Sequence, residues 1–260
     1  MKRIHVLIIA AGAAWPGADI AGAADDPVLL DAPEIRIDGD SAQSDWYLRG
    51  DVGYAAWRRV GSPEFGDTTG GATFDDARFG KPLAAALGLG YRINDMLRTD
   101  VTADFFASDM AGEFSAGQPC ASSPVGTSCA YDGAADVRAY GLMLNGYLDI
   151  ANVAGFTPYV GAGVGVTRIV WDDFAGSSTC AGAACAAGSE AVSFAGESDW
   201  RFSYALMAGV TYALTDRVKL DLGYRYSDIA GGPMFSSADG NADDDGFRRH
   251  EVRVGLQIGF

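Results

Sequence analysis

Histidine is the side chain that most often supplies a general base, and this sequence of 260 residues contains two, His5 and His250. His5 lies in the predicted export signal described below, so Ser–His–acid chemistry has to pass through His250. Arg249 and Glu251 flank His250, but no serine stands within two positions of it and no carboxylate pair is evident. We therefore predict that the chain is not an enzyme, and a lipid-modifying site centred on His250 is the least favoured alternative.

Two glycine-rich and acidic patterns fall short of known binding motifs. Gly161, Gly163 and Gly165 alternate with other residues, whereas a dinucleotide-binding loop needs G-x-G-x-x-G followed by a helix. The run from Asp239 to Gly246 lacks the glycine that a calcium loop has at its sixth position, and His250 stands where its glutamate belongs. We predict no cofactor and no metal site. Weak divalent-ion binding is the alternative to a flexible acidic loop tip.

The four cysteines form two close pairs, Cys120 with Cys129 and Cys180 with Cys185, with eight and four residues between their members. Neither pair has the two-residue spacing of a zinc knuckle. Because an exported chain enters an oxidising compartment, we predict two local disulfides, with zinc binding as the alternative.

The N-terminus has the three parts of a secretory signal peptide. Lys2 and Arg3 form a basic head, an apolar stretch follows as far as Ala14, and small residues continue to Ala23 and Ala24. Residues 1–24 are therefore predicted to be a cleaved export signal, because the apolar stretch is too short for a membrane anchor.

From residue 45 onward the apolar residues recur with period two, which is the spacing of β-strands, and helical spacing is absent. One face of most runs is apolar, whereas the other is small, polar or charged. We predict eight strands, at residues 46–60, 83–93, 97–105, 137–150, 157–171, 201–214, 218–227 and 248–260.

Glycines and connection lengths indicate where these strands lie. Gly53, Gly88, Gly90 and Gly223 share a face with aspartate and arginine, as a narrow and crowded lumen requires. Three short turns alternate with four long loops at residues 61–82, 106–136, 172–199 and 228–247, the pattern of a membrane barrel of even strand number. We therefore predict an all-β fold, an eight-stranded antiparallel transmembrane up-and-down β-barrel over residues 46–260.

Twelve charged residues have lumen-facing parity, six of each sign. A balanced set inside a barrel that is only wide enough for side chains predicts an ion network that plugs it. A small-solute channel is the alternative. The predicted network consists of Arg49, Asp51, Arg92, Arg98, Asp100, Asp104, Asp149, Lys219, Asp221, Arg225, Glu251 and Arg253.

Four arginines with lipid-facing parity, Arg58, Arg138, Arg168 and Arg248, stand where strands meet the long loops. An arginine on this face costs about 2–4 kcal/mol at mid-bilayer but only about 0–1 kcal/mol near the interface. Because guanidinium groups bind phosphate bidentately, we predict a lipopolysaccharide-binding belt. Ordinary snorkelling is the alternative. Aromatic residues at the strand ends predict interfacial belts: Trp46, Trp57, Phe105, Tyr140, Trp171, Phe202, Tyr226 and Phe260.

The net charge of −15 argues against nucleic acid as a partner, because phosphate contacts need a basic surface. The four long loops hold 18 acidic and two basic residues. Residues 25–45 hold seven acids and one arginine. We predict that residues 25–45 form an acidic periplasmic segment and that the acidic loops lie outside the cell.

Residues 46–54 (WYLRGDVGY), 157–165 (TPYVGAGVG) and 222–226 (LGYRY) carry a family resemblance. Together and in this order they resemble the small outer-membrane proteins of alphaproteobacteria, the opacity-type relatives of the outer membrane protein A barrel. The resemblance covers about residues 45–260, and the alternation ending in Phe260 resembles the signal read by the barrel-assembly machinery.

This resemblance implies a place in the bacterial outer membrane and a structural or surface-display role. Envelope integrity is the leading expectation, with adhesion or host contact through the loops as a candidate role. Outer-membrane lipid, lipopolysaccharide and, during biogenesis, the assembly machinery are the implied partners, and a monomer is expected.

Overall fold

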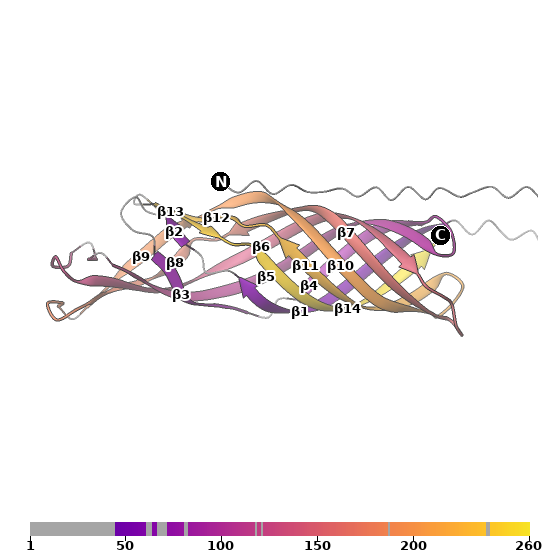
Figure 1. Cartoon of the computed structure of the whole chain (residues 1–260), viewed down its shortest axis with the longest axis horizontal. Helices are drawn as coiled ribbons and strands as arrows, with labels where there is room; N and C mark the ends of the chain where they lie inside the picture. The colour runs from indigo at the N-terminus through magenta and orange to yellow at the C-terminus, as the bar shows by residue number, and fades with distance from the viewer. Residues whose placement is uncertain are drawn as a thin grey trace, which may run out of the picture. The chain divides into compact units, whose positions relative to one another are not determined.

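The computed structural model describes residues 45–60, 64–66, 72–80, 83–117, 119–120, 122–186, 188–237 and 240–260 (Figure 1). The predicted export signal and most of the acidic segment at 25–45 lie outside these residues. In the described part, no helix is long and apolar enough to cross a membrane.

Eight strands form a closed ring in which every neighbouring pair is antiparallel, and β1 closes the ring by pairing with both β14 and β4. This confirms the predicted fold. In ring order the strands are β1 (Trp46–Val60), β4 (Leu83–Arg92), β5 (Leu97–Ala116), β6 (Ser128–Asp149), β7 (Phe156–Trp171), β10 (Ser198–Ala213), β11 (Val218–Ile229) and β14 (Phe247–Gly259).

Side chains along each strand point alternately out of the ring and into it. On β1, Leu48 is 53% exposed, whereas its neighbour Arg49 is 6% exposed. The outward face carries leucine, valine and aromatic side chains on every strand of the ring, and these face hydrocarbon in a bilayer. The apolar surface is therefore outside and the ionic surface is inside.

The short turns lie at one end of the ring and are held by side chains. Asn94 Oδ1 accepts hydrogen bonds from the backbone N–H groups of Met96 and Leu97, at 2.9 and 2.8 Å. Thr215 Oγ1 accepts one from the N–H of Val218 at 3.0 Å. Asparagine and threonine favour turns for this reason, and both turns stand where the sequence predicts them.

The segments predicted as four long loops are largely β-structure, so that part of the prediction is wrong. β5 and β6 have 20 and 22 residues, about twice the 9–11 residues that cross a bilayer. Their outer halves continue into a second closed ring, in the order β5, β3, β2, β13, β12, β9, β8 and β6. Its further strands are β2 (Glu64–Gly66), β3 (Ala72–Phe79), β8 (Phe174–Ala181), β9 (Ser189–Gly196), β12 (Gly232–Ser237) and β13 (Gly240–Asp244).

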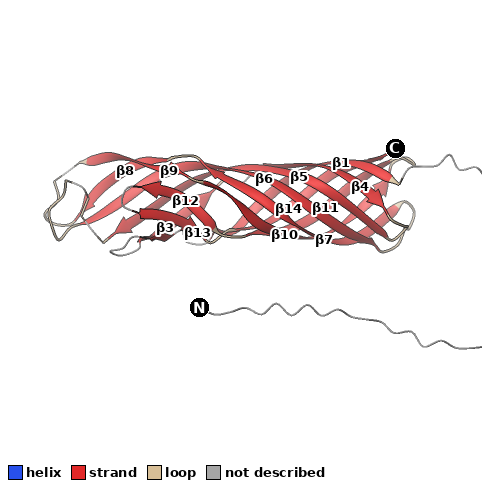
Figure 2. Ribbon diagram, turned by 90° about the horizontal axis from the view of Figure 1, so that it is seen from above, coloured by secondary structure: helices blue, strands red, loops and turns tan. Residues whose placement is uncertain are grey.

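We call this second ring, with β5 beyond Phe105 and β6 before Tyr140, the outer tier. Phe105 and Tyr140 are cross-strand partners with ring centroids 5.3 Å apart. Below this pair the outward face is apolar, and above it the outward face carries exposed aspartate and glutamate. Figure 2 shows the outer-tier strands at one end of the molecule and the C-terminus at the other.

The outer tier encloses an apolar core. Trp171 is 3% exposed there, so its predicted place in an aromatic belt is wrong. It shares inward parity on β7 with Thr167 and Ile169. The core is formed by Ala84, Phe106, Met110, Phe114, Ala135, Val137, Ala139, Ile169, Trp171, Phe174, Ile229, Met234, Phe235, Ala242 and Phe247.

Candidate functional site in the barrel interior

Arg49 is the centre of a buried ion network near the short-turn end of the barrel. Its Nε and Nη2 donate to the two carboxylate oxygens of Asp51 at 2.8 and 2.9 Å. Its Nη1 donates to Asp100 at 2.9 Å and to the hydroxyl of Tyr147 at 2.8 Å, and Asp221 lies 3.7 Å from Nη2. These side chains are all buried, so loss of one partner leaves an uncompensated charge that costs about 3–5 kcal/mol.

Neutral side chains supply further donors to the same carboxylates. Asn145 Nδ2 donates to Asp100 at 2.7 Å. The hydroxyl of Tyr159 and Nε2 of Gln257 each donate to Asp221 at 2.8 Å. The buried carboxylates are therefore hydrogen-bonded as well as ion-paired, which is what their burial requires.

Arg98 joins this network from the adjoining part of β5. Its Nε donates to Asp149 at 3.0 Å. The guanidinium carbon lies 4.2 Å from the ring centroid of Tyr147 and 4.6 Å from that of Tyr159. A desolvated cation over aromatic faces is stabilised by about 2 kcal/mol. The two terminal nitrogens of Arg98 are buried and have no hydrogen-bond partner in the described part of the chain.

A second ion network lies nearer the outer tier. Asp104 accepts from Arg225 Nη1 at 2.6 Å and from Arg253 Nη2 at 2.8 Å. Glu251 accepts from Arg253 Nε at 2.6 Å and from Arg249 Nη2 at 2.8 Å. Three arginines therefore share two carboxylates, in contacts that run between β5, β11 and β14.

The structure places all twelve predicted lumen charges on the inward face and joins ten of them in ion pairs. The other two, Arg92 and Lys219, form no ion pair with a described residue. The prediction omitted the charge of Arg249 and the hydrogen-bonding side chains of Tyr47, Asn145, Tyr147, Tyr159 and Gln257. Period-two parity could have assigned these residues to the lumen, because each lies on the same strand face as a predicted lumen charge.

Glycine on the inward face makes room for these networks. A Cβ atom added to Gly90 would fall within the ring of Tyr47, and one added to Gly53 would overlap the carboxylate of Glu251. Glycine is therefore needed on the inward face because a Cβ atom would occupy the space of a neighbouring side chain. Any larger residue at these positions has to displace a member of the network.

The interior changes from ionic to apolar where the ring meets the outer tier. The guanidinium carbon of Arg249 lies 3.9 Å from the ring centroid of Phe106, a residue of the apolar core. A cavity of about 20 Å³ remains between the two layers, bounded in part by Asp104, Met143 and Ser203. That volume is roughly the space of one water molecule.

Arg201 fastens the outer tier to the ring. Its Nη1 donates to both carboxylate oxygens of Asp244, at 2.6 and 2.7 Å, and its Nη2 donates to the carbonyl of Pro233 at 2.7 Å. Burial raises the pKa of Asp244, and the ion pair with Arg201 acts in the opposite direction. The expectation of a flexible acidic loop tip at residues 239–246 is therefore wrong for Asp244, which is buried.

Three of the four arginines of the predicted belt are described with their side chains, and all three are exposed. Arg138 Nη2 donates to Asp172 at 2.6 Å, and Arg248 Nε donates to Asp228 at 3.1 Å. Arg168 Nη2 lies 3.4 Å from the hydroxyl of Ser198. The side chain of Arg58 lies outside the described residues. The three described arginines come from β6, β7 and β14, so the structure does not gather them into one cluster.

His250 lies on the outward face, between aromatic side chains. Its Nδ1 hydrogen-bonds to the hydroxyl of Tyr224, and its ring centroid is 5.2 Å from that of Tyr226. Arg249 and Glu251, its sequence neighbours, point inward, so the strand separates His250 from the nearest carboxylate in sequence. Among the described residues there is no cluster of three or more histidine, cysteine or acidic side chains that could hold a metal ion.

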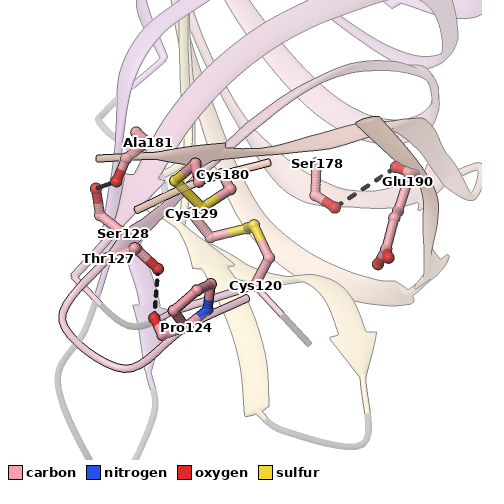
Figure 3. Close-up of a disulfide and its surroundings, with 10 residues drawn as sticks. Cys120, Pro124, Thr127, Ser128, Cys129, Ser178, Cys180, Ala181 and Glu190 are labelled. Carbon is pink, nitrogen blue, oxygen red and sulfur yellow. Dashed lines mark hydrogen bonds between the residues drawn. A yellow bond between two sulfur atoms is a disulfide. The ribbon is translucent and has the colours of Figure 1, made fainter. Parts of the chain in front are cut away.

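Both predicted disulfides are confirmed, Cys120–Cys129 and Cys180–Cys185, with Cα atoms 4.9 and 5.6 Å apart. Cys129 on β6 and Cys180 on β8 are cross-strand partners, so the two bridges lie side by side in the outer tier (Figure 3). Nearby, the hydroxyl of Thr127 donates to the carbonyl of Pro124 at 2.7 Å.

Comparison with known proteins agrees with this architecture. The family described as outer membrane protein beta-barrel domain matches residues 28–260. An uncharacterized protein of Brucella abortus (strain 2308) is 35% identical over 265 residues, which cover 90% of this chain and 89% of that protein. A candidate adhesin of Rickettsia prowazekii (strain Madrid E) is 25% identical over 224 residues, covering 84% of this chain and 88% of that protein. The crystal structure of the outer membrane protein OprG from Pseudomonas aeruginosa has a similar fold, with a TM-score of 0.52 at 14% identity, covering 84% of this chain and 96% of that one.

Proposed function

The chain belongs to the outer membrane protein β-barrel family, and from this premise we propose that it is a structural surface protein whose interior is closed to solutes. The observation that carries the proposal is the filling of the interior by two successive layers. Ion networks around Arg49 and Glu251 fill the membrane ring, and the apolar core around Trp171 and Phe174 fills the outer tier.

Electrical recording separates this proposal from the channel alternative. The purified chain, refolded and inserted into planar lipid bilayers, is expected to give no stable open steps. Both layers would have to rearrange before a hydrated ion could cross, because an eight-stranded interior is only wide enough for side chains. Stable conductance steps of porin size would overturn the closed interior and favour the small-solute channel.

The outer tier suits a role in surface contact. Its outward face carries acidic residues in opposed positions on β5 and β6, Asp109 with Asp136 and Glu113 with Asp132. Arg78 lines the same hollow as Glu113 and Asp132. The carboxylates of Asp109 and Asp136 repel each other at opposed strand positions, so a cationic partner stabilises that pair. The similarity to a candidate adhesin supports the same reading. We infer that the outer tier presents a stiff acidic surface to cationic groups on host or neighbouring cells.

The test of this contact compares the wild-type strain with a deletion strain and with a strain that carries a fourfold variant. A deletion strain is expected to lose both adhesion and detergent resistance. A strain carrying Asp109→Asn, Glu113→Gln, Asp132→Asn and Asp136→Asn is expected to keep detergent resistance, because the barrel is intact, and to lose adhesion. Unchanged adhesion in this strain at equal surface abundance would refute the acidic contact surface while leaving the structural role in place.

We further propose that the belt arginines bind lipopolysaccharide phosphate. Arg138 and Arg248 are exposed near the outer interface, and Asp172 and Asp228 orient them. Replacement of Arg58, Arg138, Arg168 and Arg248 by serine should reduce co-purifying lipopolysaccharide. The matched fourfold lysine variant retains charge but lacks the bidentate fork and should give an intermediate amount. Unchanged lipopolysaccharide content in the serine variant would favour ordinary snorkelling.

A further inference from the structure

Two arginines stand directly opposite each other at the short-turn end of the interior. Arg92 on β4 and Arg98 on β5 are cross-strand partners, and both lie on the inward face of the ring. Like charges at such positions destabilise a sheet. Asp149 bonds to Nε of Arg98 at 3.0 Å, but the two terminal nitrogens of Arg98 are buried without a hydrogen-bond partner among the described residues.

Lys219 brings a third cation to the same place. It lines a small cavity together with Arg92, Tyr47 and Gln257. Arg217 and Asp216, which are both exposed, also line this cavity, and their formal charges sum to zero. Among the inward-facing side chains at this position, the three cations Arg92, Arg98 and Lys219 outnumber the one carboxylate, Asp149, by two.

We propose that Arg92 and Lys219, which line this cavity, form a binding site for a small oxyanion at the periplasmic mouth of the barrel. Arg98 does not line the cavity, but an oxyanion paired with Arg92 offsets the repulsion between the two opposed guanidinium groups. Guanidinium matches the two oxygens of phosphate or carboxylate, and the lysine ammonium adds a point charge. The site does not depend on whether the interior is closed or on any contact made by the outer tier.

The oxyanion has two chemically distinct sources at this mouth. Phosphate groups belong to phospholipids of the periplasmic leaflet, and carboxylates belong to peptide-bearing polymers of the periplasm. Both present two or more oxygens to a guanidinium. The positive charges of Arg92 and Lys219 favour an oxyanion, and the experiment distinguishes its source.

The test uses thermal unfolding of the full mature chain in neutral detergent at constant pH and ionic strength. Replacing chloride by inorganic phosphate should raise Tm with saturation, because a ligand that binds only the folded state stabilises it. Arg92→Gln and Lys219→Gln should each weaken the response, and the double variant should abolish it. Arg92→Gln should also raise Tm in chloride alone, since it removes the repulsion from Arg98. Arg78→Gln, the same substitution on the exposed outer-tier strand β3, should respond like the wild type.

A second readout requires no variant. Phosphate should slow acylation of the Lys219 amine by an N-hydroxysuccinimide ester, with Lys81 as the internal reference. Acetate and soluble peptidoglycan peptides test the carboxylate source, and nanodiscs containing phosphatidylglycerol test the lipid source. The site is refuted if phosphate and acetate both leave Tm and Lys219 acylation unchanged. It is equally refuted if the double variant responds as the wild type does.

Discussion

Arg201 and Asp244 join the membrane ring to the outer tier through one guanidinium nitrogen that donates to both carboxylate oxygens, at 2.6 and 2.7 Å. Arg201 belongs to β10, whereas Asp244 ends β13, so this contact couples a spanning strand to a hairpin of the outer tier. Both side chains are almost fully buried. A buried pair of this kind makes each partner dependent on the other.

We predict that Arg201→Gln destabilises the outer tier at neutral pH. Removing one partner of a buried pair costs about 3–5 kcal/mol. Urea unfolding in detergent, followed by the fluorescence of Trp171 in a background whose other tryptophans are replaced by phenylalanine, should show the loss as a lower midpoint. Asp243→Asn is the control, because Asp243 is exposed beside Asp244 and its replacement should leave the midpoint unchanged. A wild-type midpoint for Arg201→Gln would contradict the coupling.

The same contact predicts a pH dependence of defined sign. Burial raises the pKa of Asp244 in the folded state, so the folded chain binds this proton more tightly than the unfolded chain does. The stability that the protonated Asp244 carboxyl contributes is fully present below its unfolded-state pKa of about 4. It is lost as the pH rises through the folded-state pKa of Asp244. Arg201→Gln, which leaves Asp244 without its counter-ion, should therefore recover stability on acidification. The double variant Arg201→Gln with Asp244→Asn should lack this recovery, and urea midpoints at several pH values measure both.

Close packing inside the membrane ring predicts different outcomes for two strand glycines. Gly90→Ala places a methyl group within the ring of Tyr47, whereas Gly146→Ala meets open space on the outward face. Overpacking of a filled interior costs about 1–3 kcal/mol. The Gly90 variant should lose its compact form on gel electrophoresis at a lower temperature than wild type, and the Gly146 variant should not. Equal behaviour of the two variants would show that the interior near Tyr47 is loosely packed.

The apolar core of the outer tier predicts a large effect from one phenylalanine. Phe174 is 0% exposed, whereas Phe202 is 59% exposed on the lipid-facing side. Phe174→Ala should cost about 3–5 kcal/mol by leaving a cavity. Limited proteolysis should then cut the outer tier while the membrane ring stays protected. Phe202→Ala should leave the cleavage pattern of the wild type, and early cleavage in both variants would argue that the outer tier has no cooperative core.

Period two was enough to predict the membrane ring because lipid on one side and a narrow lumen on the other impose strict alternation. Leu48 and Arg49 illustrate this, since one faces outward and the other is the centre of an ion network. The same parity correctly predicted that Asp104, Arg225 and Arg253 point inward. It did not predict which side chains pair with one another. Pair geometry depends on the register between strands, which a single-strand pattern does not encode.

The outer tier was missed because its strands are short and rich in glycine, alanine and serine. Such residues give only weak alternation between apolar and polar side chains. β8 and β9 were therefore predicted to be part of the acidic loop at residues 172–199. The stronger signal lay in β5, where Phe106, Met110 and Phe114 keep inward parity beyond the expected strand end. Trp171 was misplaced for a related reason, because its position at a strand end was given more weight than its parity.

Both disulfides link cysteines that are near in sequence, nine and five positions apart. The disulfides of an oxidised chain therefore close only two small covalent loops. The backbone outside these loops carries no covalent cross-link from them. Each bridge therefore closes within a single hairpin, and neither one ties together strands that are distant in the sequence. A chain that is oxidised before it folds can still form every pairing of the membrane ring, which a bridge between distant strands would restrict.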